Sequence, residues 1–136
     1  MAKLTDSGIG LLVKSHAEGI KKELLEKNQE TFRRVVGRKS GVYTLTKGKK
    51  LYYVGLSTKL RSRLKSHLDD KHRGKWDRFS FYSIGKKKYL KDIESMLVRV
   101  ARPQGNDQEG KFGKNKNLKK RFINELKRDM LDTFAG

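Results

Sequence analysis

Six polar side chains in the middle of the chain are of the types that could hydrolyse a phosphodiester bond. Two are the phenols of Tyr43 and Tyr53, which lie ten residues apart in the triplets GVY, at residues 41–43, and YVG, at residues 53–55. The other four are a guanidinium, an imidazole, a carboxylate and an amide, carried by Arg63, His67, Glu94 and Asn106. A guanidinium binds phosphate, a carboxylate can hold a divalent ion, and a phenol or imidazole can move a proton.

The two tyrosines are expected on one β-hairpin. Residues 51–54 are rich in β-forming types, and residues 46–50 form a polar loop of ordinary hairpin length. Whether the two phenols meet depends on the pairing register, which the sequence does not fix. Because tyrosine is a favoured strand residue, packing alone could explain both positions. The case for chemistry therefore depends on the other four residues.

Arg63 and His67 are expected on one face of a helix. Ser57 and Thr58 are capping residues ahead of an apolar stripe that runs to about Leu68. Residues four apart share a helix face, so the guanidinium and the imidazole should project together. Since this helix starts directly behind the second triplet, that face should lie near the end of the hairpin.

Glu94 and Asn106 belong to a second helix and the loop after it. The apolar spacing predicts a helix from Tyr89 to Arg102, which Pro103 stops. Taken singly, each polar residue also has a purely structural explanation: a solvated arginine, a capping histidine, a surface glutamate and an asparagine in a glycine-containing turn. The functional interpretation depends on their occurring together.

The remaining segments complete an α+β fold. Apolar residues recur at spacings of three and four between Ile9 and Val36, which predicts one or two amphipathic helices. Arg78–Ile84 alternates in the manner of a third strand. We therefore expect a small three-stranded antiparallel sheet flanked by helices, with extra helices at both ends. The last helix carries an apolar stripe of Leu118, Phe122, Leu126, Met130 and Phe134, and we expect the first four of these to pack on the core or on the N-terminal arm.

Length and charge set the broad class. The 136 residues predict a single domain, with an N-terminal helical arm at residues 1–39, a core at 40–107 and a basic loop with a C-terminal helix at 108–136. Lys and Arg total 34 against 15 acidic residues, a net charge of +19, which indicates a polyanionic partner such as nucleic acid. The absence of cysteine excludes disulfides and thiolate metal sites. With no apolar run long enough for a bilayer, we expect a soluble, cytoplasmic protein without a membrane partner.

In their order and spacing, the two triplets and the four further polar residues resemble the catalytic domain of the GIY-YIG nuclease family. The resemblance covers about residues 40–107. It implies a metal-dependent endonuclease that cuts DNA, using one Mg²⁺ or Mn²⁺ ion held by Glu94. Because no zinc finger, helix-turn-helix signature or other reader module is evident, we expect little sequence specificity.

The resemblance also implies a role for each residue. Arg63 would bind the phosphate and offset transition-state charge, and His67 would support that charge or orient a tyrosine. Asn106 would brace the site. Tyr43 is preferred as the base, with Tyr53 aligning water or phosphate, although the sequence does not decide between the two phenols.

The basic residues around the proposed site are expected to contact phosphates with little base preference. They are Lys59, Arg61, Lys65, Lys71, Arg73, Lys75, Arg78, Lys86, Lys87 and Lys88. Trp76 lies among them, and we expect it to pack rather than to stack on a base.

A second class of function stays open, a non-catalytic DNA- or RNA-binding module that retains the fold. The joint presence of Tyr43, Arg63 and Glu94 favours the nuclease, because a pure binder does not need a carboxylate near phosphates. The sequence leaves the oligomeric state open between monomer and dimer.

Overall fold

The protein is built on one antiparallel sheet, seen in a computed structural model that describes residues 12–135. Its strands lie in the order β1-β4-β2-β3. Their bounds are β1 (Val13–Lys21), β2 (Gly41–Lys47), β3 (Lys50–Ser57) and β4 (Arg78–Ile84). The expected α+β class is confirmed, but the sheet has four strands among the described residues, not three.

The additional strand, β1, lies where the sequence predicted a helix within Ile9–Val36, so that prediction is wrong for this part; residues 9–11 lie outside the described residues. The pairing of β1 with β4 shifts register between Ala17 and Ile20, and Gly19 between them has a φ of 67°. A bulge of this kind interrupts the alternation of a strand. The apolar residues are left at spacings of three and four, which are typical of a helix.

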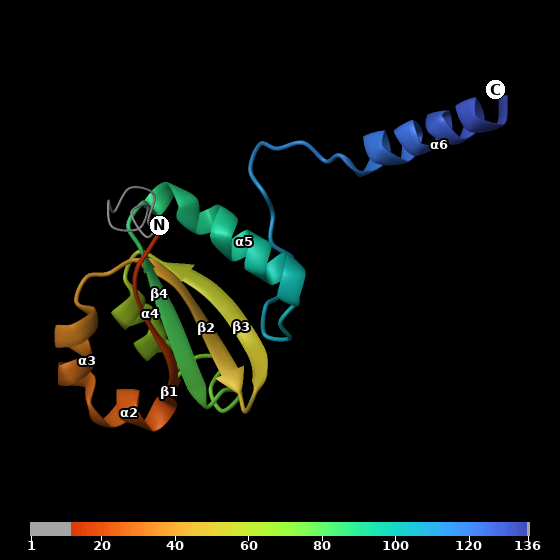
Figure 1. Cartoon of the computed structure of the whole chain (residues 1–136). Helices are drawn as coiled ribbons and strands as arrows, with labels where there is room; N and C mark the ends of the chain where they lie inside the picture. The colour runs from red at the N-terminus through yellow and green to blue at the C-terminus, as the bar shows by residue number, and fades with distance from the viewer. Residues whose placement is uncertain (1–11, 136) are drawn as a thin grey trace, which may run out of the picture.

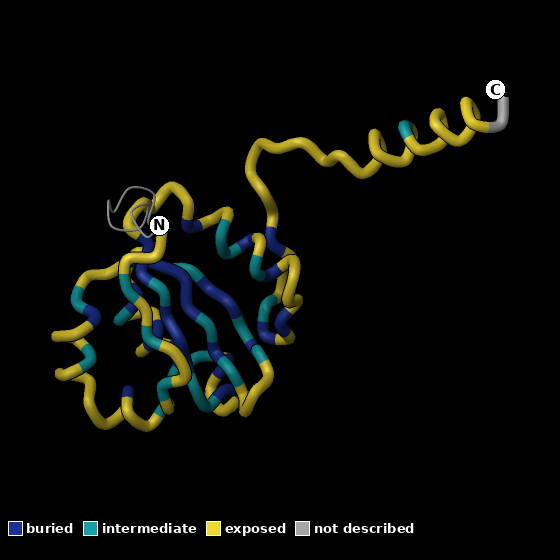
Figure 2. Tube along the Cα trace, in the orientation of Figure 1, coloured by how far each residue is buried: buried dark blue, intermediate teal, exposed yellow. Residues whose placement is uncertain are grey.

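Helices cover both faces of the sheet (Figure 1). On one face lie α2 (Lys22–Lys27), α3 (Gln29–Val36) and α4 (Leu60–Ser66). On the other lies α5 (Leu90–Ala101), entered through the short helix η1 (Lys87–Tyr89). Each face has its own apolar cluster, so the central strands β2 and β4 are mostly buried, whereas β1 and the outer helix surfaces are mostly exposed (Figure 2). The sheet therefore lies between two layers of helices, with α4 on one face and α5 on the other.

The hairpin of β2 and β3 contains an irregularity that matters for the site. Leu45 pairs with Tyr53, but the next pair is Thr46 with Leu51, so Tyr52 is an extra residue on β3. A bulge allows two successive side chains to turn the same way. Tyr52 and Tyr53 accordingly both pack toward the cluster beneath α4.

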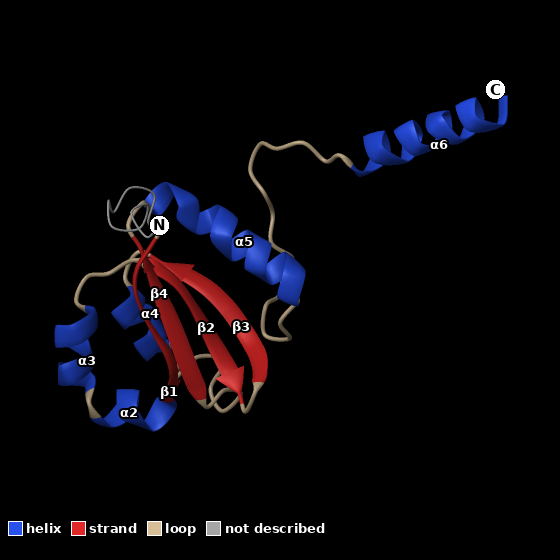
Figure 3. Ribbon diagram, viewed as in Figure 1, coloured by secondary structure: helices blue, strands red, loops and turns tan. Residues whose placement is uncertain are grey.

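The last helix, α6 (Lys119–Ala135), projects away from the rest of the molecule (Figures 1 and 3). Leu118, Phe122, Leu126 and Met130 are exposed, so the prediction that this stripe packs on the core or the arm is wrong. The spacing of these residues specifies an amphipathic helix but not what covers it. Neither α6 nor any other helix of the described part is long and apolar enough to cross a membrane.

Candidate active site

Tyr43 lies at the centre of a buried chain of hydrogen bonds. Its Oη lies 2.7 Å from Nε2 of His67 and accepts a hydrogen bond from Nε of Arg63 at 3.3 Å. Nδ1 of His67 lies 2.7 Å from a carboxylate oxygen of Asp70. Tyr43 and His67 are 0% and 1% exposed. Helix α4 and its C-terminal cap thus bring the guanidinium and the imidazole to one phenol oxygen, as their spacing predicted.

The Asp70 carboxylate determines which nitrogen of His67 carries the proton. A carboxylate only accepts, so we assign the proton to Nδ1, which donates it, and Nε2 accepts the hydroxyl proton of Tyr43. The other carboxylate oxygen accepts a hydrogen bond from the backbone N–H of His72 at 2.9 Å, so the carboxylate is itself held in place. Donation therefore runs in one direction, from Arg63 through the phenol and the imidazole to Asp70.

Burial determines the protonation states of Tyr43 and His67 in this chain of hydrogen bonds. It raises the pKa of Tyr43 far above its ordinary value, with a further contribution from Tyr53, and Arg63 opposes the rise. Burial also lowers the pKa of His67, against the opposing effect of Asp70. At neutral pH the phenol is therefore protonated and the imidazole is an uncharged acceptor beside it.

Gly55, the last residue of the second triplet, makes room for Tyr43. The two residues pair across β2 and β3, and a Cβ added to Gly55 would lie 2.4 Å from the Tyr43 Oη and 2.8 Å from the Tyr53 ring. The ring centroids of Tyr43 and Tyr53 lie 6.1 Å apart. The register that the sequence left open thus brings the two phenols side by side, and the glycine permits it.

A second tyrosine–histidine pair lies next to the first. Oη of Tyr52 lies 2.7 Å from Nδ1 of His72, whose ring centroid is 4.6 Å from that of Tyr53 and 5.3 Å from that of His67. Sequence reasoning missed Tyr52, His72 and Asp70. A signal was available in the polar run at residues 69–72, DDKH, which directly follows α4 and holds one of only three histidines.

A cavity of about 320 Å³ lies between α4, β3 and α5, and Asp70 and both histidines line it. Five of the six side chains proposed from the sequence line it: Tyr53, Arg63, His67, Glu94 and Asn106. Tyr43 is not among the lining residues, because it lies behind the wall that Arg63 and His67 form. Further charged or titratable side chains line the cavity as well: Asp70, Lys71, His72, Lys91, Asp107 and Glu109.

The cavity's cations differ in whether a carboxylate neutralises them. Lys71 contacts Asp107 at 2.5 Å, and Lys91 contacts Glu94 at 3.4 Å. Arg63 contacts a phenol instead and has no carboxylate partner among residues 12–135. Its guanidinium is therefore the positive charge most available to an anion in the cavity.

Glu94 is the side chain proposed to hold a divalent ion. It is 18% exposed, lines the cavity from α5, and makes only a long contact with Lys91. Across residues 12–135, no three histidine, aspartate or glutamate side chains converge as a metal-binding group. The donor set therefore suits an ion of the Mg²⁺ type that keeps most of its waters and is completed by a phosphate, not one held in a closed protein cage.

Both polar atoms of the Asn106 side chain bind the edge strand of the sheet. Its Oδ1 accepts from the Val54 N–H at 3.0 Å, and its Nδ2 donates to the Val54 carbonyl at 2.7 Å. The neighbouring Gly105 N–H donates to the Tyr52 carbonyl at 2.7 Å. The loop after α5 thus pairs with the edge strand β3 as a further strand would.

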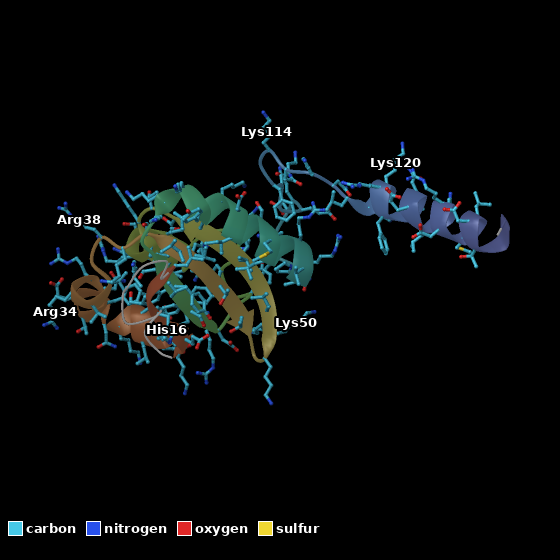
Figure 4. All side chains as sticks on the ribbon, turned by 45° about the horizontal axis from the view of Figure 1, so that its top comes forward. His16, Arg34, Arg38, Lys50, Lys114 and Lys120 are labelled. Carbon is cyan, nitrogen blue, oxygen red and sulfur yellow. The ribbon has the colours of Figure 1, made fainter. Side chains whose placement is uncertain are left out.

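The basic residues expected to contact phosphates do not form one surface around the cavity. Of the ten, only Lys71 lines it. Arg78 opens β4 and Lys86–Lys88 follow its end, so these groups are about 25 Å apart at roughly 3.3 Å per strand residue. Other cations point outward on widely separated parts of the molecule, as Arg34, Lys50 and Lys114 do (Figure 4).

Trp76 packs, as the sequence predicted. It is fully buried, and its indole N–H donates to the carbonyl of His67 at 3.2 Å. Its role is to hold the turn after α4 against the core.

No family model matches the sequence, and no curated protein matches it. Among solved structures, the chain is similar to the GIY-YIG N-terminal endonuclease domain of UvrC from Thermotoga maritima. One crystal structure of that domain, a point mutant bound to its catalytic divalent cation, gives a TM-score of 0.49 at 19% identity, covering 60% of this chain and 99% of that one. Another, bound to magnesium, gives 0.47 at 20% identity, covering 58% and 98%. The roles proposed below rest on side-chain geometry.

Proposed function

We propose that the protein is a metal-dependent endonuclease that hydrolyses DNA phosphodiester bonds with little sequence specificity. The observation that carries the proposal is a cavity lined by an unneutralised guanidinium and a carboxylate, with His67 of the buried tyrosine–histidine pair in its wall. Each is a group that phosphodiester hydrolysis can use: an anion clamp, an ion ligand and a proton acceptor.

Arg63 binds the scissile phosphate in this proposal. Its Nε is occupied by Tyr43, but Arg63 lines the cavity and has no carboxylate partner among the described residues. A guanidinium can hold two phosphate oxygens at once and offset the charge that develops on them in the transition state.

Tyr43 and His67 accept the proton of the attacking water. When Arg63 turns toward the phosphate, it leaves a position on the Tyr43 Oη that the water can occupy. The water then gives a proton to Oη while the phenol proton passes to Nε2 of His67, 2.7 Å away. This transfer avoids a free phenolate, which the raised pKa of Tyr43 disfavours. Asp70 stabilises the imidazolium that results.

The water oxygen forms the new bond to phosphorus as the bond to the leaving oxygen breaks. Glu94 would hold a divalent ion, which would supply charge stabilisation to the leaving group. Asn106 holds the loop after α5 against β3, which fixes one border of the cavity that Glu94 and Arg63 line.

Low sequence specificity is supported by the distribution of the charges. The exposed lysines are scattered over separate elements, and side chains of this type contact phosphates rather than base edges.

The alternative, a DNA- or RNA-binding module without catalysis, is favoured by one observation. The proposed acceptor Tyr43 is enclosed and does not line the cavity. A pure binder would keep DNA affinity and show no cleavage at any divalent-ion concentration.

The test compares Glu94→Gln with Glu109→Gln, because both carboxylates line the same cavity but Glu109 pairs with Arg102 at its rim. Nicking of supercoiled plasmid is measured with Mg²⁺ or Mn²⁺, alongside an EDTA control. We expect Glu94→Gln to nick about a hundredfold more slowly or worse, and Glu109→Gln to stay within about threefold of the unaltered protein. Equal rates for unaltered protein and Glu94→Gln would show that the metal site is assigned wrongly.

A further inference from the structure

His72 combines deep burial with access to the cavity. It is 4% exposed, yet it lines the cavity next to Tyr53 and His67. Its backbone N–H donates a hydrogen bond to the Asp70 carboxylate, and its Nδ1 is hydrogen-bonded to the Tyr52 hydroxyl. Its ring also packs against the Tyr53 ring. Three separate contacts fix the orientation of a ring that the hydrolysis described above does not use.

The second ring nitrogen of His72 is Nε2. No hydrogen bond to it is formed within the described residues, where Nδ1 alone is engaged. Across the same residues, Ser95 Oγ is the only fully enclosed side-chain nitrogen or oxygen without a partner. The Nε2 atom of His72 is therefore not enclosed, and the open space next to this ring is the cavity.

Tyr52 determines that Nε2 carries the proton. Burial raises the pKa of Tyr52, so its hydroxyl keeps its hydrogen at neutral pH. A phenol is a better donor than acceptor, so we assign the 2.7 Å contact as donation from Tyr52 to Nδ1 of His72. In a neutral imidazole the other nitrogen then bears the hydrogen, which points at the cavity.

We propose that His72 is a second phosphate-binding residue, whose Nε2–H donates to a non-bridging oxygen of the scissile phosphate opposite Arg63. The proposal deepens the nuclease function and rests on it. Burial lowers the pKa of His72, so the donor is uncharged at neutral pH and adds no positive charge to a cavity that must also admit a divalent ion. Tyr52 is the positioning residue for this donor.

Two amide substitutions test the inference, because each reproduces one ring nitrogen. In His72→Gln the amide reaches the position of Nε2 and can still donate into the cavity. In His72→Asn the amide reaches only the position of Nδ1, so it can still accept from Tyr52 but offers nothing to the phosphate. We expect His72→Asn to lower the rate of single-turnover cleavage by about tenfold or more, and His72→Gln to restore most of it.

Thermal unfolding of both variants separates this role from a structural one. Comparable midpoints with unequal cleavage rates would support the proposal. Equal losses of cleavage in the two variants, or losses that follow the drop in unfolding midpoint, would overturn it.

A second readout does not require cleavage. Protein with ¹⁵N-labelled histidine is titrated with a short DNA duplex in EDTA, and the chain's three histidines make the ring signals assignable through single variants. We expect the His72 signals to show the Nε2–H form and to shift on DNA binding. If the unaltered protein fails to nick DNA but these signals move, the nuclease function fails and the phosphate contact stands. If it nicks and they do not move, the contact at His72 is wrong.

Discussion

Two tyrosine–histidine pairs lie side by side with the same 2.7 Å between phenol oxygen and imidazole nitrogen, yet their surroundings differ. In the pair of Tyr43 and His67, the phenol also contacts a guanidinium, and the second ring nitrogen is bound to Asp70. In the pair of Tyr52 and His72, the second ring nitrogen has no hydrogen-bond partner among the described residues, and His72 lines the cavity. We therefore propose different roles for the two pairs: the first accepts a proton from the cavity, and the second donates a hydrogen bond into it.

Asp70 connects the two pairs. One of its oxygens accepts from Nδ1 of His67 and the other from the backbone of His72. The same carboxylate therefore sets a tautomer in one pair and a ring position in the other. The two histidines are expected to carry their protons on different nitrogens, Nδ1 in His67 and Nε2 in His72.

The largest expected difference is between Tyr43→Phe and Tyr52→Phe. Each removes one hydroxyl and keeps the ring. Tyr43→Phe removes the proposed acceptor of the water's proton, so we expect single-turnover cleavage to fall by about a hundredfold or more. Tyr52→Phe frees the His72 ring and should cost less than about tenfold. DNA affinity, measured by fluorescence anisotropy, should stay close to unaltered in both. Similar rates in the two variants would mean that the pairs are interchangeable.

Two glycines offer a steric version of the same comparison. A Cβ at Gly55 would lie 2.4 Å from the Oη of Tyr43, and one at Gly105 would lie 2.5 Å from the ring of Tyr52. We expect both alanine substitutions to destabilise the fold by about 1–3 kcal/mol, measured by denaturant unfolding. Cleavage should fall further in Gly55→Ala than in Gly105→Ala.

Gly113→Ala is the matched control, since a Cβ there has no neighbour within 4 Å and its φ is not positive. It should leave both stability and cleavage unchanged. A Gly55→Ala protein with full activity would show that the phenol of Tyr43 is not held where the site needs it.

The smallest expected effect concerns pH. Burial lowers the pKa values of His67 and His72, so below about pH 6.5, the ordinary histidine value, the unfolded chain binds more protons than the folded one. Stability should therefore fall as the pH drops below that value, and level off once the folded histidines protonate. Urea unfolding at a series of pH values measures the slope. His67→Gln should reduce it.

The sequence was informative where the chemistry follows local periodicity. The two triplets, the i, i+4 pair of Arg63 and His67 and the inward side of α5 each depend on spacing within one element, and the structure brings these residues to one cavity or its wall. The features that the sequence did not predict depend on two β-bulges. In β1 a bulge at Gly19 gave a strand the spacing of a helix, and in β3 a bulge turned Tyr52 to the same side as its neighbour. Such irregularities depend on pairing with another strand, which single-chain periodicity does not record.

The central claim is that the cavity beside Arg63 cleaves DNA rather than only binding it. The most direct test measures plasmid nicking and duplex affinity for Arg63→Ala and Arg61→Ala at one salt and Mg²⁺ concentration. Both arginines lie on α4, but only Arg63 lines the cavity. We predict that Arg63→Ala nicks about a hundredfold more slowly with affinity lowered only modestly, while Arg61→Ala nicks at close to the unaltered rate. Equal nicking by both variants would contradict the account.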